Sequence, residues 1–453
     1  PAAIQEDALN RLARADGKPF TCTAMGLVDI GTGQILYGQN LTAKMHPASC
    51  TKILTTLLAL EDIEAGRVKL SDMVVVSKAA ATTGESGLWL QVGERMSLHD
   101  LLVGVMVRSA NDASRAVAEY LGHGDAAAFM RRMNQRAAEL GAVSTHYVNP
   151  HGLHMDLNGN SRGGDDHWTT PYDLLLFTMT AWKYPFFRQL CLMDGEPVSW
   201  EQMRPLAGQV QPGKKPPPPH PDYRIIPNRN KLLHRYSECV GVKTGFTRQA
   251  GACLVSAALR GDRAVMAVTM HSASGLDRWT EAEALLRFGL DEYHTVSLVK
   301  AGQTVQEVPV SGGLAASVAA VAGEDVAVVW PKSVPAPQPT FSVRHQVSAP
   351  LAQGLPLGAM LLRMPSGEVR QVGLTAGRDV ERAGVLLGPW SLWLLFALTA
   401  VGVVCYGAVA ETHRRRGALL AARRGAVDPR WSGEGQWSGD SRAGLEGVAD
   451  GSD

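Results

Sequence analysis

The sequence is poor in cysteine and has no excess of charge of one sign. Six cysteines among 453 residues are too few for a disulfide scaffold. No two of them form the C-x-x-C pair that is typical of cysteine-based zinc sites. Lys and Arg number 44 against 43 Asp and Glu, so the net charge of +1 gives no reason to expect a nucleic acid partner. These absences argue against a disulfide-rich module, a zinc-binding module and a DNA- or RNA-binding protein.

Length and composition favour a folded protein of more than one domain. Hydrophobic residues make up 45% of the chain and charged residues 19%, which excludes general disorder. At 100–200 residues per domain, about two or three globular units are expected. The chain begins Pro1-Ala2-Ala3 without a signal peptide, which fits a processed secreted protein or a chain trimmed at its start.

A long uncharged segment near the C-terminus predicts a membrane span. No charged side chain occurs from Ala383 to Ala410, which exceeds the ~20 apolar residues that a spanning helix needs. We place the transmembrane helix at residues 384–410. The basic residues that follow, at 413–416, indicate the cytoplasmic side, so everything before the span is expected outside the cytoplasm. Residues 411–453 are predicted to form a basic and then, from Val427, disordered cytoplasmic tail.

The pattern of residues 1–292 predicts an α+β catalytic domain with an antiparallel sheet. A hairpin is expected over residues 25–37, and buried strands over 240–243, 252–258 and 264–270. Between them lie helical patterns from Pro47 to Gly66, from Ser97, over 126–140 and from 171 to about 181, and a last helix is expected over 281–290. The proline-rich run at 212–221 is interpreted as a surface excursion. Residues 293–380 show short strand patterns without helices and predict a small separate β-rich domain.

Three short motifs occur where serine acyl transfer needs them. Ser49 and Lys52 form S-x-x-K at the start of the first predicted helix, Ser109 and Asn111 follow the second helix, and Lys243 begins a K-T-G that ends a buried strand. Residues three apart on a helix share a face, so Lys52 can reach the hydroxyl of Ser49. A serine hydroxyl needs an adjacent base, and Lys52 can be one only if burial and a second cation, Lys243, favour its neutral form.

The neighbouring residues predict the rest of the chemistry. Ser109 would relay the proton to the leaving amine, and Asn111 would hold Lys52 and the substrate backbone. Backbone N–H groups at Ser49 and Phe246 would form an oxyanion hole. Thr244, with the positive charges of Lys243 and Arg229, would bind a substrate carboxylate.

With these motifs, the chain resembles the low-molecular-mass penicillin-binding proteins of the D-alanyl-D-alanine carboxypeptidase family, serine peptidases that trim peptidoglycan stem peptides. The resemblance covers most of the chain before the predicted span. Besides the motifs it rests on these runs: HPAS at 46–49, LVGVMVRSANDA at 102–113, NPHGL at 149–153, NRNKLL at 228–233 and GVKTGFT at 241–247. The segment after His294 is similar to the family's C-terminal domain.

The resemblance implies a β-lactamase/transpeptidase-like catalytic fold and an acyl-enzyme on Ser49 that releases terminal D-alanine. It assigns Lys52 as the base, Ser109 and Asn111 as the second element, and Arg229 to the terminal carboxylate. Lys243, Thr244, Gly245 and Phe246 would line the substrate strand. The implied ligands are stem peptides ending in D-Ala-D-Ala and β-lactam antibiotics, with no metal and no cofactor. The implied location is the bacterial cytoplasmic membrane, with the catalytic domain on the periplasmic side.

The sequence departs from the family pattern in several places. Phe246 stands where many relatives have histidine after K-T-G, so only a backbone role is expected for it. Cys50, beside the nucleophile, is interpreted as a small core residue. Many relatives hold the membrane with an amphipathic helix, whereas a true span is predicted here. His46, His151 and His154 lie near the motifs without any metal-ligand spacing.

Three alternatives remain open from the sequence. A D,D-endopeptidase that cleaves peptidoglycan cross-links would use the same residues. A class A-like β-lactamase would need a glutamate in an E-x-x-L-N segment, and the nearest match, residues 154–158, has His154 at that position. A β-lactam or cell-wall binding module that has lost catalysis would not need all the catalytic side chains that are present.

Overall fold

The computed structural model describes residues 12–201, 221–364, 367, 369–384 and 389–424. The chain divides into two compact units, residues 1–381 and 382–453. Except for Pro221, the proline-rich run predicted as a surface excursion lies outside the described residues, as does the tail predicted to be disordered from Val427.

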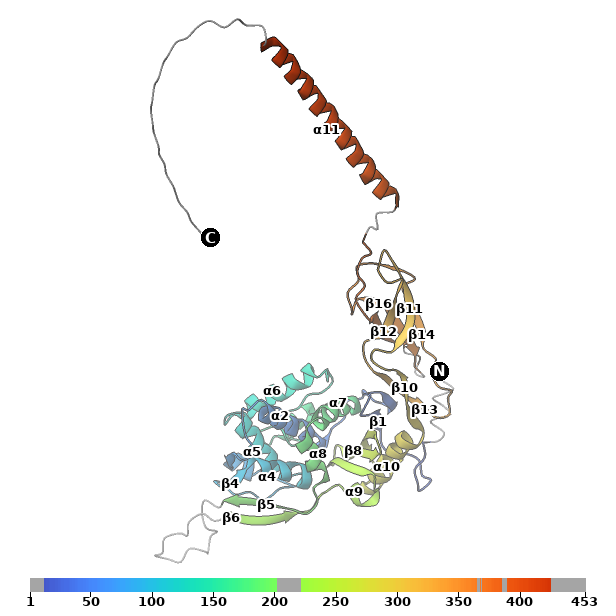
Figure 1. The fold of residues 1–453 in the computed structure, drawn as a ribbon. Helices are drawn as coiled ribbons and strands as arrows, with labels where there is room; N and C mark the ends of the chain where they lie inside the picture. Colours follow the sequence, from blue (N-terminus) through green and yellow to red (C-terminus); the bar gives the residue numbers. More distant parts are fainter. Residues whose placement is uncertain (1–11, 202–220, 365–366, 368, 385–388, 425–453) are drawn as a thin grey trace, which may run out of the picture. The chain divides into compact units, whose positions relative to one another are not determined.

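A five-stranded antiparallel sheet forms the centre of the first unit (Figure 1). Its strands lie in the order β2-β1-β9-β8-β7, and all neighbours are antiparallel. The bounds are Ala24–Asp29 (β1), Ile35–Gln39 (β2), Cys239–Thr247 (β7), Gly251–Arg260 (β8) and Arg263–Ser272 (β9). The predicted α+β class is therefore confirmed, with its N-terminal hairpin and its three C-terminal strands in one sheet.

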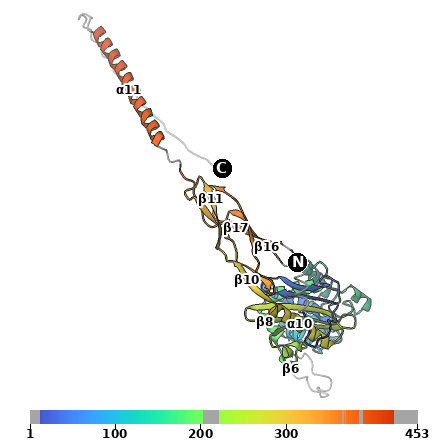
Figure 2. The same cartoon turned by 90° about the vertical axis from the view of Figure 1, so that its right-hand side faces the viewer.

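Both faces of the sheet are buried, which explains why β8 and β9 read as continuous apolar runs. Successive residues of a strand point to opposite faces. Val255 and Val268 belong to a core shared with the helices that precede β7, whereas Leu254 and Ala267 belong to a second core. Helix α10 (Gly275–Asp291) supplies the other side of the second core and packs against β8 and β9 (Figure 2).

The first core is built by a cluster of helices between β2 and β7 (Figure 1). Their bounds are Lys52–Glu64 (α2), Lys78–Ala81 (α3), Leu98–Val103 (α4), Asn111–Leu121 (α5), Ala126–Glu139 (α6), Pro171–Trp182 (α7) and Pro185–Leu192 (α8). Ser97, where a helical pattern is expected to begin, caps α4, because its hydroxyl accepts from the Asp100 N–H at 3.1 Å. The helix predicted to begin at Glu281 begins six residues earlier, since the hydroxyl of Ser274 caps α10.

A small sheet was not predicted from the sequence. It has the order β3-β4-β5-β6, with bounds Met73–Val75 (β3), Arg95–Ser97 (β4), Glu196–Glu201 (β5) and Pro221–Ile226 (β6). Strands of three residues are too short to show an alternating pattern, and β5 and β6 flank the proline-rich run. Helix α9 (Leu232–Arg235) follows β6 and leads into β7.

Between α10 and residue 384, the described residues form strands and no helix, as predicted. Strands β10 and β13 pair with each other, and a six-stranded sheet has the order β14-β16-β17-β12-β11-β15. The bounds are Tyr293–Val299 (β10), Thr304–Ser311 (β11), Ser317–Ala322 (β12), Val326–Pro331 (β13), Thr340–Val343 (β14), Val347–Ser348 (β15), Pro356–Arg363 (β16) and Val369–Ala376 (β17). A separate hydrophobic core fills this part.

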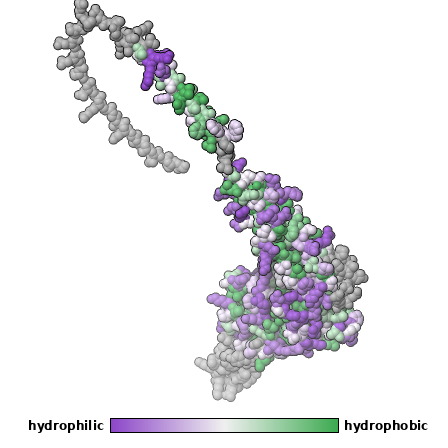
Figure 3. Space-filling view, turned by 45° about the vertical axis from the view of Figure 1, so that its right-hand side comes forward, coloured by the Kyte–Doolittle hydropathy of each residue, from purple (hydrophilic) through white to green (hydrophobic). Residues whose placement is uncertain are grey.

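The second unit contains helix α11 (Pro389–Arg424). Within the described part of the chain, it is the one helix long and apolar enough to cross a membrane, by length and composition; the window Trp390–Ala418 has a mean hydropathy of 2.2. Figure 3 shows apolar residues along most of this helix and hydrophilic residues beyond them. The helix begins at Pro389 and continues to Arg424, so the basic residues at 413–416 are helical.

Candidate active site

Ser49 lies in a tight turn that the surrounding chain holds in place. The turn is a short 3-10 helix, η1 (Ala48–Thr51), which leads directly into α2. Ala48 has a φ of 45°, and its carbonyl accepts from the Thr51 hydroxyl at 2.8 Å. A Cβ on Gly152 would lie 1.9 Å from the carbonyl oxygen of Ala48. The turn can therefore take this position only because residue 152 has no side chain.

Lys52 lies one turn after Ser49 and is fully buried. Its Nζ lies 2.9 Å from the Ser49 Oγ, 2.7 Å from the Asn111 Oδ1 and 2.7 Å from the carbonyl oxygen of His151. The structure thus brings together the serine and the lysine that the S-x-x-K spacing predicts to be neighbours, and it places Asn111 against the same amine.

Electrostatics in this buried site favour the neutral form of the Lys52 amine. Burial lowers the pKa of Lys52 well below its ordinary value, and the positive charge of Lys243 lowers it further. Burial also lowers the pKa of Lys243, to about 8, with the charges of Arg278 and Arg229 acting in the same direction. Burial and a neighbouring cation thus act together on Lys52 to favour the neutral amine, the form that a general base needs.

Ser109 is presented by an irregular helix end. It follows a single π-helical turn, η2 (Gly104–Arg108), and its backbone is left-handed with a φ of 65°. Its hydroxyl lies 2.8 Å from the Nζ of Lys243, which connects the second motif to the K-T-G strand. Left-handed backbone is uncommon for residues other than glycine and is found at functional sites held by their surroundings.

Asn111 is the first residue of α5 and is buried. Its Oδ1 accepts from Lys52, and its Nδ2 donates to the carbonyl oxygen of Gly84 at 2.9 Å. These two contacts fix the orientation of the amide. Because Nδ2 carries a second hydrogen, Asn111 can position Lys52 and still donate to a substrate carbonyl.

Strand β7 lies beside the Ser49 turn. Lys243, Thr244 and Gly245 are all buried there. A Cβ on Gly245 would lie 3.2 Å from the backbone nitrogen of Ser49, so the strand approaches the turn very closely. Phe246 is 67% exposed. Its backbone pairs with that of Ala252 in β8. Arg229 is exposed, and its N–H donates to the carbonyl of Val107 at 3.1 Å.

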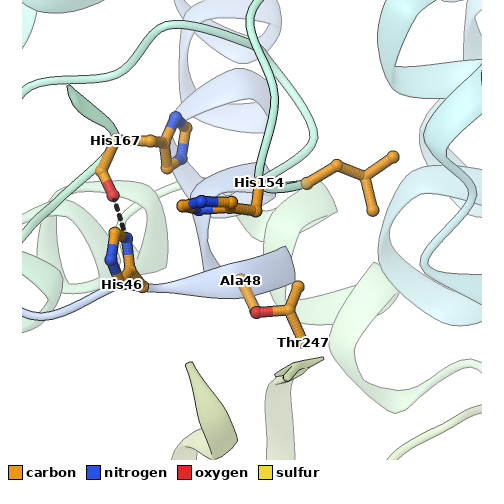
Figure 4. A pocket seen from close by; sticks show the side chains of 7 residues that line it. His46, Ala48, His154, His167 and Thr247 are labelled. Atoms are coloured by element: carbon orange, nitrogen blue, oxygen red, sulfur yellow. Dashed lines mark hydrogen bonds between the residues drawn. The ribbon is translucent and has the colours of Figure 1, made fainter. Parts of the chain in front are cut away.

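A small pocket opens beside the Ser49 turn (Figure 4). Its polar lining comes mainly from His46, His154 and His167, and the hydroxyl of Thr247 completes it. The Nδ1–H of His46 donates to the carbonyl oxygen of His167 at 2.8 Å, and the His167 ring lies 2.8 Å from the Thr51 hydroxyl. Burial lowers the pKa of His167 to about 3, so its ring is neutral and supports the turn.

Three contributions were missed or only partly foreseen from the sequence. From the sequence, the NPHGL run contributes only to the resemblance, but its His151 carbonyl contacts Lys52 directly and its Gly152 makes room for the Ser49 turn. Arg278, from α10, donates to the carbonyl oxygen of Gly245 at 2.9 Å. A lone arginine on a helix gives no sequence signal for this contact, because it depends on how α10 packs on the sheet.

The described residues contain no group of three or more His, Cys, Asp or Glu side chains placed to hold a metal ion. Cys50 is buried beside Ser49, and burial raises the pKa of its thiol to about 11.

The chain is similar to known proteins over most of its length. A family model described as D-alanyl-D-alanine carboxypeptidase matches residues 14–274, and one described as penicillin-binding protein 5, C-terminal domain, matches residues 293–382. D-alanyl-D-alanine carboxypeptidase DacF of Bacillus subtilis is 28% identical over 374 residues, which cover 81% of this chain and 89% of that protein. DacC of Escherichia coli is 28% identical over 378 residues, which cover 82% of this chain and 86% of DacC.

Solved structures agree with the sequence comparison. The crystal structure of penicillin binding protein 5 from Haemophilus influenzae has a TM-score of 0.65 and 25% identity, covering 81% of this chain and 99% of that one. The crystal structure of D-alanyl-D-alanine carboxypeptidase DacD from Francisella tularensis has a TM-score of 0.60 at the same identity, covering 81% and 95%.

Proposed function

Because this chain belongs to the D-alanyl-D-alanine carboxypeptidase family, a family of serine hydrolases that bind penicillin, we propose that Ser49 is its nucleophile and Lys52 its general base. The enzyme acts on peptidoglycan peptides that end in D-Ala-D-Ala, and it is acylated by β-lactams. The observation that supports the assignment most directly is the 2.9 Å separation of the Lys52 Nζ from the Ser49 Oγ, with the amine buried.

In the proposed acylation, the Ser49 oxygen attacks the carbonyl carbon between the two terminal D-alanines, and its proton passes to the neutral Lys52 amine. The N–H groups of Ser49 and Phe246 stabilise the negative oxygen that develops. The peptide C–N bond then breaks, and the leaving amine takes a proton through the hydroxyl of Ser109. Water hydrolyses the ester and restores Ser49 for the next cycle.

The substrate carboxylate is proposed to bind beside Lys243. The Thr244 hydroxyl would donate to it, and the charges of Lys243 and Arg229 would attract it. Gly245 would allow the peptide to lie close to the strand. Burial of Lys243 and Thr244 supports this arrangement, because the attraction between opposite charges is stronger where water is excluded.

We further propose a division of the chain into a catalytic domain (residues 1–292), a β-rich domain (293–380), a membrane helix and a cytoplasmic tail. Helix α11 would span the membrane, which is supported by its length and by the hydropathy of 2.2 over Trp390–Ala418. The basic residues at 413–416 favour the cytoplasmic side for its C-terminal end, so the catalytic domain would lie on the periplasmic face.

The test combines turnover with covalent labelling. A pentapeptide ending in D-Ala-D-Ala should lose its terminal D-alanine, and benzylpenicillin should add its intact mass to the protein on a peptide that contains Ser49. Enzyme acylated in advance should release no D-alanine until the adduct hydrolyses. A penicillin adduct mapped to another serine, with D-alanine release unaffected, would contradict the assignment.

The pH dependence of kcat/KM should report the two lysines. Activity requires Lys52 neutral and Lys243 charged, and the pKa of Lys243 is about 8. Since Lys243 loses its proton as the pH rises through its pKa, kcat/KM should fall above pH ~8. Measurement from pH 5 to 10 should show this alkaline limb. In Lys243→Arg, where the cation persists at every pH, the limb should move upward; an unmoved limb would assign it to another group.

A further inference from the structure

An exposed tryptophan stands near the second motif with no role in the chemistry described above. Trp89 is 62% exposed, and its φ of 58° places it in the left-handed region, which is rare for a bulky side chain. The residues on both sides are fixed by one carboxylate: the N–H groups of Leu88 and Leu90 donate to Asp112 at 3.0 and 3.1 Å. Asp112 is itself buried and follows Asn111. The loop therefore holds the indole at the surface, beside the active-site motif.

Arg108 lies against this indole. Its guanidinium carbon is 5.0 Å from the centre of the Trp89 ring, within the range of a cation–π contact. Arg108 directly precedes Ser109, and its carbonyl accepts from the Ser86 hydroxyl at 3.0 Å. The arginine is thus attached to the active-site loop through its backbone and to the Trp89 loop through its side chain.

Several positively charged side chains lie at this end of the site. Among the described residues, neither Arg108 nor Arg229 forms an ion pair with an acidic side chain. Burial lowers the pKa of Arg108, and the charge of Arg229 lowers it further; Arg229 also lowers the pKa of Lys243. The geometry agrees, because Lys243 contacts the Ser109 hydroxyl at 2.8 Å and the backbone N–H of Arg229 donates to Val107, the residue before Arg108. Three cations are therefore attached to the chain around Ser109.

Resting on the proposed function, we propose that Trp89 and Arg108 form an outer subsite that receives the C-terminal carboxylate of the peptide substrate. From Arg108 the carboxylate passes by way of Arg229 to its final position beside Lys243 and Thr244. A carboxylate is the fitting ligand because it relieves the repulsion among the cations. The substrate's C-terminal end is favoured because Arg229, which belongs to the proposed carboxylate end of the site, is joined to the Arg108 loop by the hydrogen bond from its backbone N–H to the Val107 carbonyl. Trp89 is a positioning residue that keeps the Arg108 guanidinium in place.

The full-length protein should be tested with two peptides that differ only at the C-terminus, D-Ala-D-Ala carboxylate and D-Ala-D-Ala carboxamide. Arg108→Gln should lower kcat/KM for the carboxylate about fivefold, mainly through KM, the size expected for one exposed charge pair. Release of D-alaninamide from the carboxamide should change less than about twofold. Arg108→Lys should retain most of the activity, and Arg344→Gln, an exposed arginine in the β-rich part, should match wild type.

Ionic strength gives a second measurement. Because salt screens exposed charges, wild-type kcat/KM for the carboxylate should fall with added salt, and the fall should be shallower in Arg108→Gln. Trp89→Gly, which accepts the left-handed backbone but lacks the ring, should raise KM in the same direction, and Trp89→Phe should not.

The proposal is wrong if Arg108→Gln lowers kcat/KM equally for both peptides or for neither. It is also wrong if the effect of Arg108→Gln disappears when a carboxylate is removed from an upstream residue of the peptide instead of from its C-terminus. A wild-type protein that releases no D-alanine from the carboxylate peptide would instead contradict the proposed function, so the two failures can be told apart.

Discussion

Replacing Lys52 by methionine should lower the rate of acylation by benzylpenicillin about 10²- to 10⁴-fold, the usual contribution of a general base. Methionine fills a similar buried volume but cannot accept the Ser49 proton. The Asn111 Oδ1 and the His151 carbonyl lose their donor, so some loss of stability is also expected. Stopped-flow or mass-spectrometric acylation kinetics would measure the effect, and a thermal melt would show that the variant is folded.

Lys52→Arg separates the loss of a base from the loss of a charge. Arginine keeps the positive charge and the donors, but it stays protonated at every accessible pH. If Lys52 acts as the base, this variant should be as slow as Lys52→Met. Near wild-type acylation in Lys52→Arg would mean that the residue contributes only charge, and the proton would then have to leave Ser49 by another route.

Replacing Gly152 by alanine should lower the acylation rate about 10²-fold, although residue 152 takes no part in the chemistry. The new Cβ would lie 1.9 Å from the carbonyl oxygen of Ala48, so the turn that carries Ser49 must shift. A displacement on the order of 1 Å is enough for such a loss, because catalysis depends on the alignment of the nucleophile. Backbone strain adds to the effect, since Gly152 has a φ of 88°.

The chain offers a matched control for this prediction. Gly159 has nearly the same φ, 87°, but a Cβ there would meet nothing within 4 Å. Gly159→Ala should therefore cost about 1 kcal/mol of stability from the left-handed backbone alone and leave acylation unchanged. Equal acylation rates in Gly152→Ala and Gly159→Ala would show that the contact with Ala48 does not position Ser49.

Helix α11 illustrates what composition can and cannot determine. Its apolar run was found from the sequence because a bilayer requires a long uncharged segment, whatever the rest of the protein does. The helix itself continues through His413 and the arginines after it to Arg424, which the hydropathy of the sequence does not report, because helix continuation is a local backbone preference. The same reason explains the late start predicted for α10, whose first turn at Gly275 is polar.

Close-packed contacts between distant segments were not predictable in the same way. The close approach of Gly152 to Ala48 and the hydrogen bond from Arg278 to Gly245 each join residues that lie more than 30 positions apart in the sequence. No periodicity or spacing encodes such a contact, because it arises only after helices and sheet have packed.

The sequence by itself determined the family, the α+β class, the antiparallel sheet and the order of the three motifs. It could do so because the motifs are short and local, and because strands and helices show in periodic burial. Only the tertiary structure decided that one buried amine contacts Ser49, Asn111 and His151 at once, and that a second cation stands beside Ser109. The protonation state of a lysine depends on the water removed from it and on the charges packed around it, and both follow from the fold rather than from the spacing of residues.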